Sequence, residues 1–84
     1  MPFQPVTPEK LSTAVVRQIE QLLLRGILRP GERLPSEREL SDRLEVSRPS
    51  LREAIAALSE RGLLTSRKGA GVYVAEELGS AFSP

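Results

Sequence analysis

Two short helical segments joined by only two residues constrain the fold of this chain more than any other feature of its sequence. The first is expected over residues 36–44, where Ser36-Glu-Arg-Glu39 has the spacing of a capping box. The second is expected over residues 47–61, so that residues 45–46 make a tight connection. Because a helix of about two turns is not stable alone in water, the pair must be held by packing against a shared core.

A third helix is predicted before this pair. Thr7 is expected to cap it, with Pro8 in the first helical position, because proline lacks the amide hydrogen that would go unbonded there. Gly26 and the pair Pro30-Gly31 end the pattern. The apolar residues expected to face the core recur at helical spacing: Leu11, Val15, Ile19, Leu22 and Leu23.

Short extended segments complete the predicted fold. Residues 33–34 follow a turn and predict a minimal strand, whereas residues 63–67 and 72–75 flank a Gly-containing turn and predict a β-hairpin. The helix before the hairpin has its own apolar stripe, made of Leu51, Ala54, Ile55 and Leu58. The expected fold class is therefore mainly α with a small β-hairpin, which is the winged helix-turn-helix arrangement of three helices plus a wing.

The length of 84 residues allows one domain with a single small core. We expect a flexible N-terminal arm over residues 1–7 and the winged helix-turn-helix domain over residues 8–75. Residues 76–84 contain glycine, two serines and a terminal proline, and are expected to begin a linker.

The composition excludes several classes of function. There is no cysteine and no histidine, which argues against disulfides, zinc sites, thiol nucleophiles and imidazole catalysis. We therefore expect no cofactor, no metal and no enzymatic activity. No apolar run approaches the roughly 18–20 residues of a membrane span, so the chain is expected to be cytoplasmic and not to bind membranes. The net charge of +1 does not by itself indicate nucleic acid.

The positions of three arginines do indicate nucleic acid. Arg38 and Arg48 lie at the starts of two successive helices, where the helix dipole disfavours positive charge, and Arg52 follows Arg48 by one turn. A polyanion at these helix ends would meet free backbone N–H groups together with guanidinium groups, which contact phosphate or guanine in pairs of hydrogen bonds. The hypothesis is that residues 47–61 form a recognition helix in the major groove, with these side chains exposed and not paired within the domain.

Two of these three arginines also have a structural explanation. Arg38 has Asp42 four residues on as a possible ion-pair partner, and Arg52 has Glu45 or an acid near Glu53. Arg48 has no acidic partner at helical spacing. Two serines at the start of the helix, Ser47 and Ser50, are candidates for DNA contact, although capping explains Ser47 equally well.

The hairpin turn adds further candidates. Arg67 and Lys68 precede Gly69, and a glycine turn lets the backbone approach a phosphate or a minor groove closely. An ordinary solvated hairpin explains the same residues nearly as well. After a helix-turn-helix, however, a basic glycine turn is typical of a wing, so residues 63–75 are predicted to lie at the minor groove.

Several longer motifs occur in one order along the chain. They are Gly26-Ile-Leu-Arg-Pro-Gly-Glu-Arg-Leu-Pro-Ser-Glu-Arg-Glu-Leu40, Val46-Ser-Arg-Pro-Ser-Leu-Arg-Glu-Ala54, Gly62-Leu-Leu64 and Gly69-Ala-Gly-Val-Tyr-Val74. From Leu11 to Ala75 the chain closely resembles the N-terminal domain of GntR-family regulators, and its arginine motifs are most similar to those of the FadR branch.

The resemblance implies a winged helix-turn-helix that binds palindromic operators as a homodimer. It also implies that Arg38, Arg48 and Arg52 contact DNA and that Gly69 reaches the minor groove. Members of the family carry a C-terminal domain that dimerises and binds a small-molecule effector; we expect residues 76–84 to lead toward such a domain, which this sequence lacks. Repression is the commoner outcome in the family, so a metabolite-responsive repressor is expected.

Two residues depart from the family pattern. Many relatives have glycine at the position of Glu45, so a left-handed turn there would strain this chain by about 1 kcal/mol. The residue type at the position of Lys68 varies in the family, so the resemblance assigns no fixed role to this lysine. The alternative function is a winged-helix protein-interaction module without DNA readout.

Overall fold

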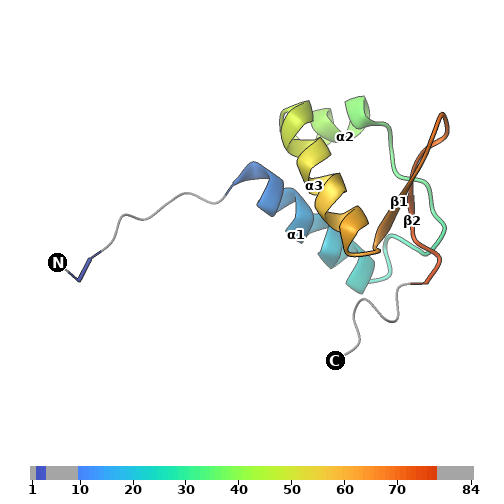
Figure 1. Ribbon diagram of the computed structural model, residues 1–84, viewed down its shortest axis with the longest axis horizontal. Helices are drawn as coiled ribbons and strands as arrows, with labels where there is room; N and C mark the ends of the chain where they lie inside the picture. The colour runs from blue at the N-terminus through green and yellow to red at the C-terminus, as the bar shows by residue number, and fades with distance from the viewer. Residues whose placement is uncertain (1, 4–9, 78–84) are drawn as a thin grey trace.

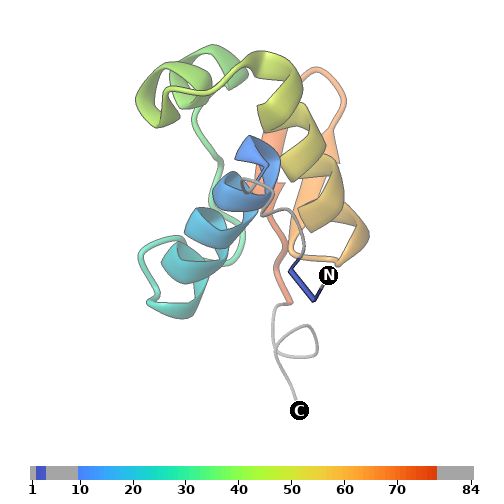
Figure 2. The same ribbon diagram turned by 90° about the vertical axis from the view of Figure 1, so that its left-hand side faces the viewer.

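The computed structural model describes residues 2–3 and 10–77 of the chain. Its elements are α1 (Leu11–Leu24), α2 (Glu37–Leu44), α3 (Arg48–Glu60), β1 (Leu64–Arg67) and β2 (Gly71–Val74). Helices α1 and α3 pack together, α2 lies across the end where α3 begins, and the antiparallel hairpin flanks α3 (Figures 1 and 2). The predicted winged helix-turn-helix is confirmed. The predicted arm, residues 1–7, and linker, residues 76–84, fall largely outside the described residues.

Helix α1 begins later than the sequence predicts. Its first helical residue is Leu11, preceded by Lys10 with an extended backbone (φ −64°, ψ 144°) whose side chain makes no capping hydrogen bond. The predicted cap, Thr7, and the predicted first helical residue, Pro8, lie outside the described residues. Because packing stabilises a helix more than its sequence preferences do, the first inward-facing residue, Ser12, marks where α1 gains support.

The caps of α2 and α3 are serines, as predicted. Ser36 Oγ accepts a hydrogen bond from the Glu39 N–H at 3.1 Å, and Ser47 Oγ accepts one from the Ser50 N–H at 3.3 Å. The reciprocal half of the predicted capping box is wrong, because the Glu39 carboxylate lies 3.8 Å from the Arg43 guanidinium on the next turn. A single serine bond at the N-cap typically contributes about 1 kcal/mol, so each helix start is defined locally.

The connection between α2 and α3 turns through a left-handed residue. Glu45 has φ 55° and ψ 46°, and it is the one non-glycine residue with positive φ among those described. The turn closes with hydrogen bonds from the Glu45 N–H to the Asp42 carbonyl (3.3 Å) and from the Val46 N–H to the Ser41 carbonyl (3.1 Å). The predicted strain is therefore present, at a cost of about 1 kcal/mol relative to glycine.

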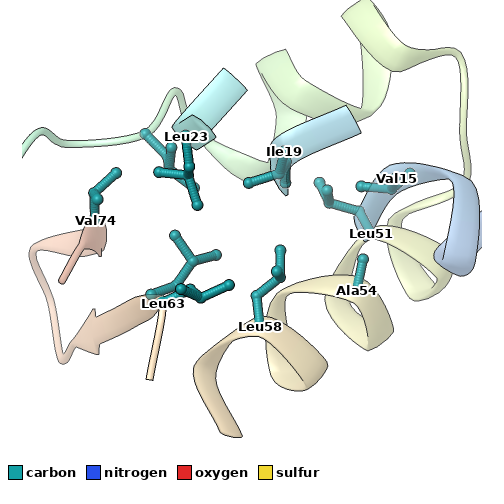
Figure 3. Packing of buried hydrophobic residues seen from close by; sticks show 10 residues of the cluster. Val15, Ile19, Leu23, Leu51, Ala54, Leu58, Leu63 and Val74 are labelled. Atoms are coloured by element: carbon teal, nitrogen blue, oxygen red, sulfur yellow. The ribbon is translucent and has the colours of Figure 1, made fainter. Parts of the chain in front are cut away.

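One hydrophobic core, drawn in Figure 3, joins α1, α3 and the hairpin, and Leu40 and Leu44 of α2 pack against it. The predicted stripe of α3 is confirmed, since Leu51, Ala54 and Leu58 are completely buried, and Ile55 packs at the edge. In α1 the prediction is wrong for Leu11, which is 53% exposed because it stands at the helix start, ahead of the first buried turn. The buried core residues are Val15, Ile19, Leu23, Leu34, Leu51, Ala54, Leu58, Leu63, Leu64 and Val74.

The hairpin carries a third, minimal strand. β1 and β2 pair from Leu64 opposite Val74 to Arg67 opposite Gly71. Arg33 forms an antiparallel bridge with Tyr73, and the predicted strand at residues 33–34 is confirmed to this extent. Because this bridge holds the segment just before α2 against β2, it places the start of α2 relative to the hairpin.

Candidate nucleic-acid interface

The predicted site residues lie on three segments at one end of the molecule. The start of α2, the start of α3 and the tip of the hairpin all reach the same end in both views (Figures 1 and 2). Arg38 belongs to the first segment, Arg48 and Arg52 to the second, and the turn from Arg67 to Gly69 to the third. The fold therefore gathers the candidates from separate parts of the sequence onto a common side.

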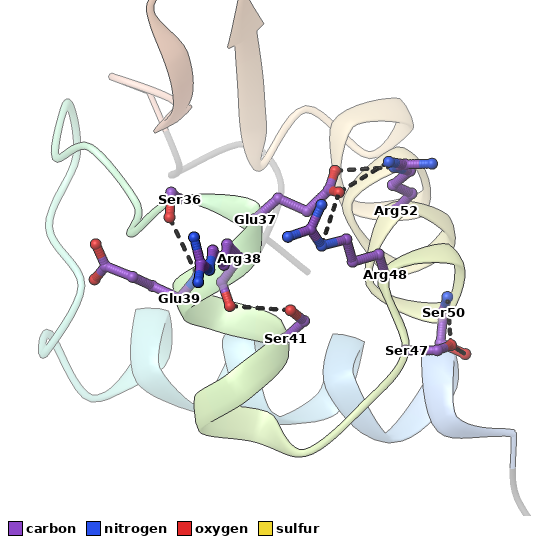
Figure 4. Close-up of polar contacts among 9 residues, drawn as sticks. All are labelled: Ser36, Glu37, Arg38, Glu39, Ser41, Ser47, Arg48, Ser50 and Arg52. Carbon is purple, nitrogen blue, oxygen red and sulfur yellow. Dashed lines mark hydrogen bonds and ion pairs between the residues drawn. The ribbon is translucent and has the colours of Figure 1, made fainter.

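A carboxylate lies among the arginines of the two helices. Glu37, the first residue of α2, accepts hydrogen bonds from Arg52 Nε and Arg52 Nη2, both at 2.9 Å. The same carboxylate lies 3.9 Å from Arg48 Nε. Figure 4 shows Glu37 projecting from α2 toward α3, with the two arginines converging on it. The side chains of Arg48 and Arg52 remain 53% and 63% exposed, so this cluster is at the surface.

These contacts correct two sequence-based expectations. The expectation that the arginines are exposed but not paired within the domain is wrong for Arg52, which pairs with Glu37 and not with Glu45 or an acid beside Glu53. Arg48, for which no acidic partner was expected, also has Glu37 as an acidic neighbour. The sequence did not indicate either contact because Arg52 and Glu37 are 15 positions apart on different helices. An acid in the first turn of a helix is common for electrostatic reasons alone, so the residue type of Glu37 carried no distinct signal.

The ion pair changes the acid–base behaviour of the carboxylate. Hydrogen bonding from Arg52 lowers the pKa of Glu37 below its usual value, with smaller lowering by the charges of Arg52 and Arg48; partial desolvation opposes these effects. The same hydrogen bonds raise the pKa of Arg52. Because a lowered pKa extends ionisation to more acidic solution, Glu37 is charged throughout the neutral range and loses its charge only well below it.

Arg38 is arranged differently. It is exposed, and no acidic side chain of the described residues lies within ion-pair distance of it, so the alternative pairing with Asp42 is wrong. Ser41 Oγ donates a hydrogen bond to the Arg38 carbonyl at 3.0 Å, which braces that turn of α2. Arg38 thus presents an unpaired guanidinium beside the free backbone N–H groups at the start of α2.

The two serines at the start of α3 bond to each other. Ser47 Oγ donates to Ser50 Oγ at 3.0 Å and accepts from the Ser50 N–H. The capping role of Ser47 is therefore present. Ser47 is exposed and Ser50 is partly exposed, so both hydroxyls can still be reached from solvent.

The tip of the hairpin is basic and exposed. Arg67 lies over the ring of Tyr73 at 4.3 Å from its centroid, while Lys68 and Gly69 are exposed in the turn. Gly69 has φ 76°, a left-handed conformation that favours glycine. The sequence did not single out Arg33, whose guanidinium approaches the backbone of Gly71 so closely that a Cβ there would lie 3.0 Å from Arg33 Nε. This arginine widens the basic edge of the hairpin.

Other kinds of site are not seen in the described part of the chain. Within residues 2–3 and 10–77, no three histidine, cysteine or acidic residues come together as a metal site would require. None of the described helices combines the length and the apolar character that crossing a membrane requires.

Comparison with known families agrees with this geometry. The model of the family described as "Bacterial regulatory proteins, gntR family" matches residues 11–74. The HTH-type transcriptional regulator Mce2R of Mycobacterium tuberculosis is 48% identical over 69 residues, which are 82% of this chain and 29% of that protein. The HTH-type transcriptional repressor NanR of an Enterobacter species is 46% identical over 66 residues, which are 79% of this chain and 25% of that protein.

Solved structures resemble the domain closely. The crystal structure of AraR(DBD) in complex with operator ORR3 is 32% identical, with a TM-score of 0.79, covering 89% of this chain and 90% of that one. A transcriptional regulator from Oenococcus oeni has a TM-score of 0.88 at 16% identity, covering 95% of this chain and 67% of that one, and supports the fold alone. The chain spans only about a quarter to a third of the length of the curated relatives above.

Proposed function

Because this chain belongs to the gntR family of bacterial regulatory proteins, we propose that it is the sequence-specific DNA-binding domain of a transcriptional regulator. Helix α3 enters the major groove and the hairpin lies at the minor groove. The observation that carries the proposal is the gathering of exposed basic residues from α2, α3 and the hairpin on one end of the fold (Figures 1 and 2).

Each basic residue has a role in this proposal. Arg48, at the tip of α3, reads a guanine edge, and Arg52 and Arg38 hold phosphate or a neighbouring base. The serines assist at the same helix tip, and the hairpin turn from Arg67 through Lys68 to Gly69 contacts the minor groove. The ion pairs with Glu37 do not prevent these contacts, since exposed ion pairs contribute little and a guanidinium has five donors.

The wider protein is proposed by analogy with its relatives. The domain proper is residues 8–75, and residues 76–84 begin a linker to an effector-binding domain. We propose that the complete regulator binds a palindromic operator as a homodimer and represses transcription in response to a small molecule, in the cytoplasm. Support comes from relatives that are about three times as long as this chain and include proteins named as repressors. The family is one of regulatory proteins, which weakens the case for an enzyme.

The response of binding to salt separates this proposal from a protein-interaction module. Each phosphate contact releases counterions, so duplex affinity should fall steeply as salt rises, with a log–log slope of about −0.9 per contact. Three to five contacts would give a slope of roughly −3 to −5. The measurement is fluorescence anisotropy with a duplex selected from a random pool, at several salt concentrations. A flat salt dependence, or no duplex bound, would favour apolar docking.

A further inference from the structure

We propose that Glu37 is a positioning residue that determines specificity. It orients Arg52 and Arg48 toward guanine edges and disfavours binding of these two arginines to phosphate alone. The inference rests on the proposed DNA-binding function, which by itself gives Glu37 no role. Glu37 would act through the arginines and need not touch DNA itself.

The geometry of the Glu37–Arg52 pair leaves the correct edge of the guanidinium free. The carboxylate occupies the side edge, which consists of Nε and Nη2, with both distances at 2.9 Å. The end edge, between Nη1 and Nη2, keeps one N–H on each nitrogen. Two parallel N–H groups of this kind match the O6 and N7 acceptors of guanine. Arg52 can therefore keep its carboxylate partner while it reads a base.

Holding the guanidinium in this way also changes what it can bind. An unpaired arginine moves through many rotamers and binds any phosphate it meets, whereas a paired one has already lost that freedom. The negative charge of Glu37 repels phosphate at short range but not the neutral edge of a base pair. Glu37 should therefore weaken non-specific binding and strengthen discrimination between bases.

The same carboxylate influences the second arginine. Arg48 Nε lies 3.9 Å from Glu37, so one acid on α2 is shared by two arginines one helical turn apart on α3 (Figure 4). Hydrogen bonding from Arg52, together with the charges of Arg52 and Arg48, lowers the pKa of Glu37 and so favours its charged form. Because α2 and α3 pack on a common core, Glu37 keeps a defined position relative to both arginines.

The test compares Glu37→Gln with Glu39→Gln, a control that removes the same charge from the same helix. Glu39 faces Arg43, which is not among the proposed contacts. Affinities are measured by anisotropy for a selected duplex and for a scrambled duplex of equal length at one salt concentration. Glu37→Gln should bind the scrambled duplex more tightly and lower the selected-to-scrambled ratio at least about fivefold, the lower limit expected for one bidentate guanine contact. Glu39→Gln should leave the ratio unchanged.

A second variant distinguishes orientation from simple charge. Arg52→Lys keeps the positive charge but loses the paired donors, so it should lower the ratio as well. Adding Glu37→Gln to Arg52→Lys should then lower the ratio less than in the wild-type background, because the Glu37–Arg52 interaction is already lost and only the influence of Glu37 on Arg48 remains to be removed. Fully additive effects, or a Glu37→Gln ratio equal to that of the wild type, would overturn the proposal. A wild-type chain that does not distinguish the two duplexes would instead contradict the proposed function.

Discussion

Replacing Arg48 with alanine is expected to weaken binding to the selected operator by about 1–3 kcal/mol, a factor of roughly 5–150. Arg48 is the first residue of α3, and its side chain is 53% exposed at the end where α2 and the hairpin tip also gather. A bidentate contact from this position would discriminate guanine from the other bases. The loss should therefore be accompanied by relaxed preference at one base pair, measured by mobility-shift titration of duplexes that each carry one changed pair.

The matched control for this variant is Arg25→Ala. Arg25 follows the last residue of α1, and that end of α1 lies away from the starts of α2 and α3 (Figure 1). Removing the Arg25 side chain takes away one positive charge without changing the proposed interface. The operator affinity of the Arg25→Ala variant should therefore stay within about twofold of the wild type. An Arg48→Ala variant that binds as tightly as this control would remove Arg48 from the set of contacts.

Replacing Leu51 with alanine is expected to lower the free energy of unfolding by about 2–5 kcal/mol. Leu51 has no exposed surface and lies beside Val15 in the core (Figure 3). Removing its isobutyl group leaves a cavity that the surrounding helices fill only in part. The loss is a large part of the roughly 5–15 kcal/mol that stabilises a typical domain, so the melting temperature should fall by about 10 °C or more.

This effect links the core to the interface, because Leu51 lies between Arg48 and Arg52 on α3. Thermal unfolding followed by circular dichroism measures it, with Leu24→Ala as the control. Leu24 is on α1 and is 59% exposed, so the control should change stability by no more than about 0.5 kcal/mol. Equal melting temperatures for the two variants would show that Leu51 does not anchor α3.

The parts of the fold determined by short-range chemistry were predictable from the sequence. The serine caps at Ser36 and Ser47 and the hairpin around Gly69 depend on neighbouring residues, and they appear where expected. The left-handed turn at Glu45 was also anticipated, although through the family resemblance and not through its residue type. Helix periodicity likewise identified most of the core.

The errors arose where tertiary packing decides. The sequence favours a start for α1 at Thr7 and Pro8, but the helix begins at Leu11, close to its first buried residue. The apolar character of Leu11 suggested burial, yet no element among residues 10–77 covers it, and it remains 53% exposed. Periodicity along one helix cannot show where the facing surface of another element ends.

The candidate site shows the same division. The arginines were identified by their places at helix starts, which are local features. Their shared partner, Glu37, was not, because its contact with Arg52 depends on how α2 crosses α3. The contribution of Arg33 at the edge of the hairpin was missed for a similar reason, since its neighbour Gly71 is distant in sequence.

The proposed function requires that the starts of α2 and α3 and the hairpin tip form one surface that binds a DNA duplex. The most direct measurement is the change in backbone amide chemical shifts of the isotope-labelled chain as a selected duplex is added. We expect the largest changes in residues 36–38, 47–52 and 67–69, with small changes along α1 around Arg17 and Gln21. Changes confined to α1, with those three segments unaffected, would contradict the proposed function.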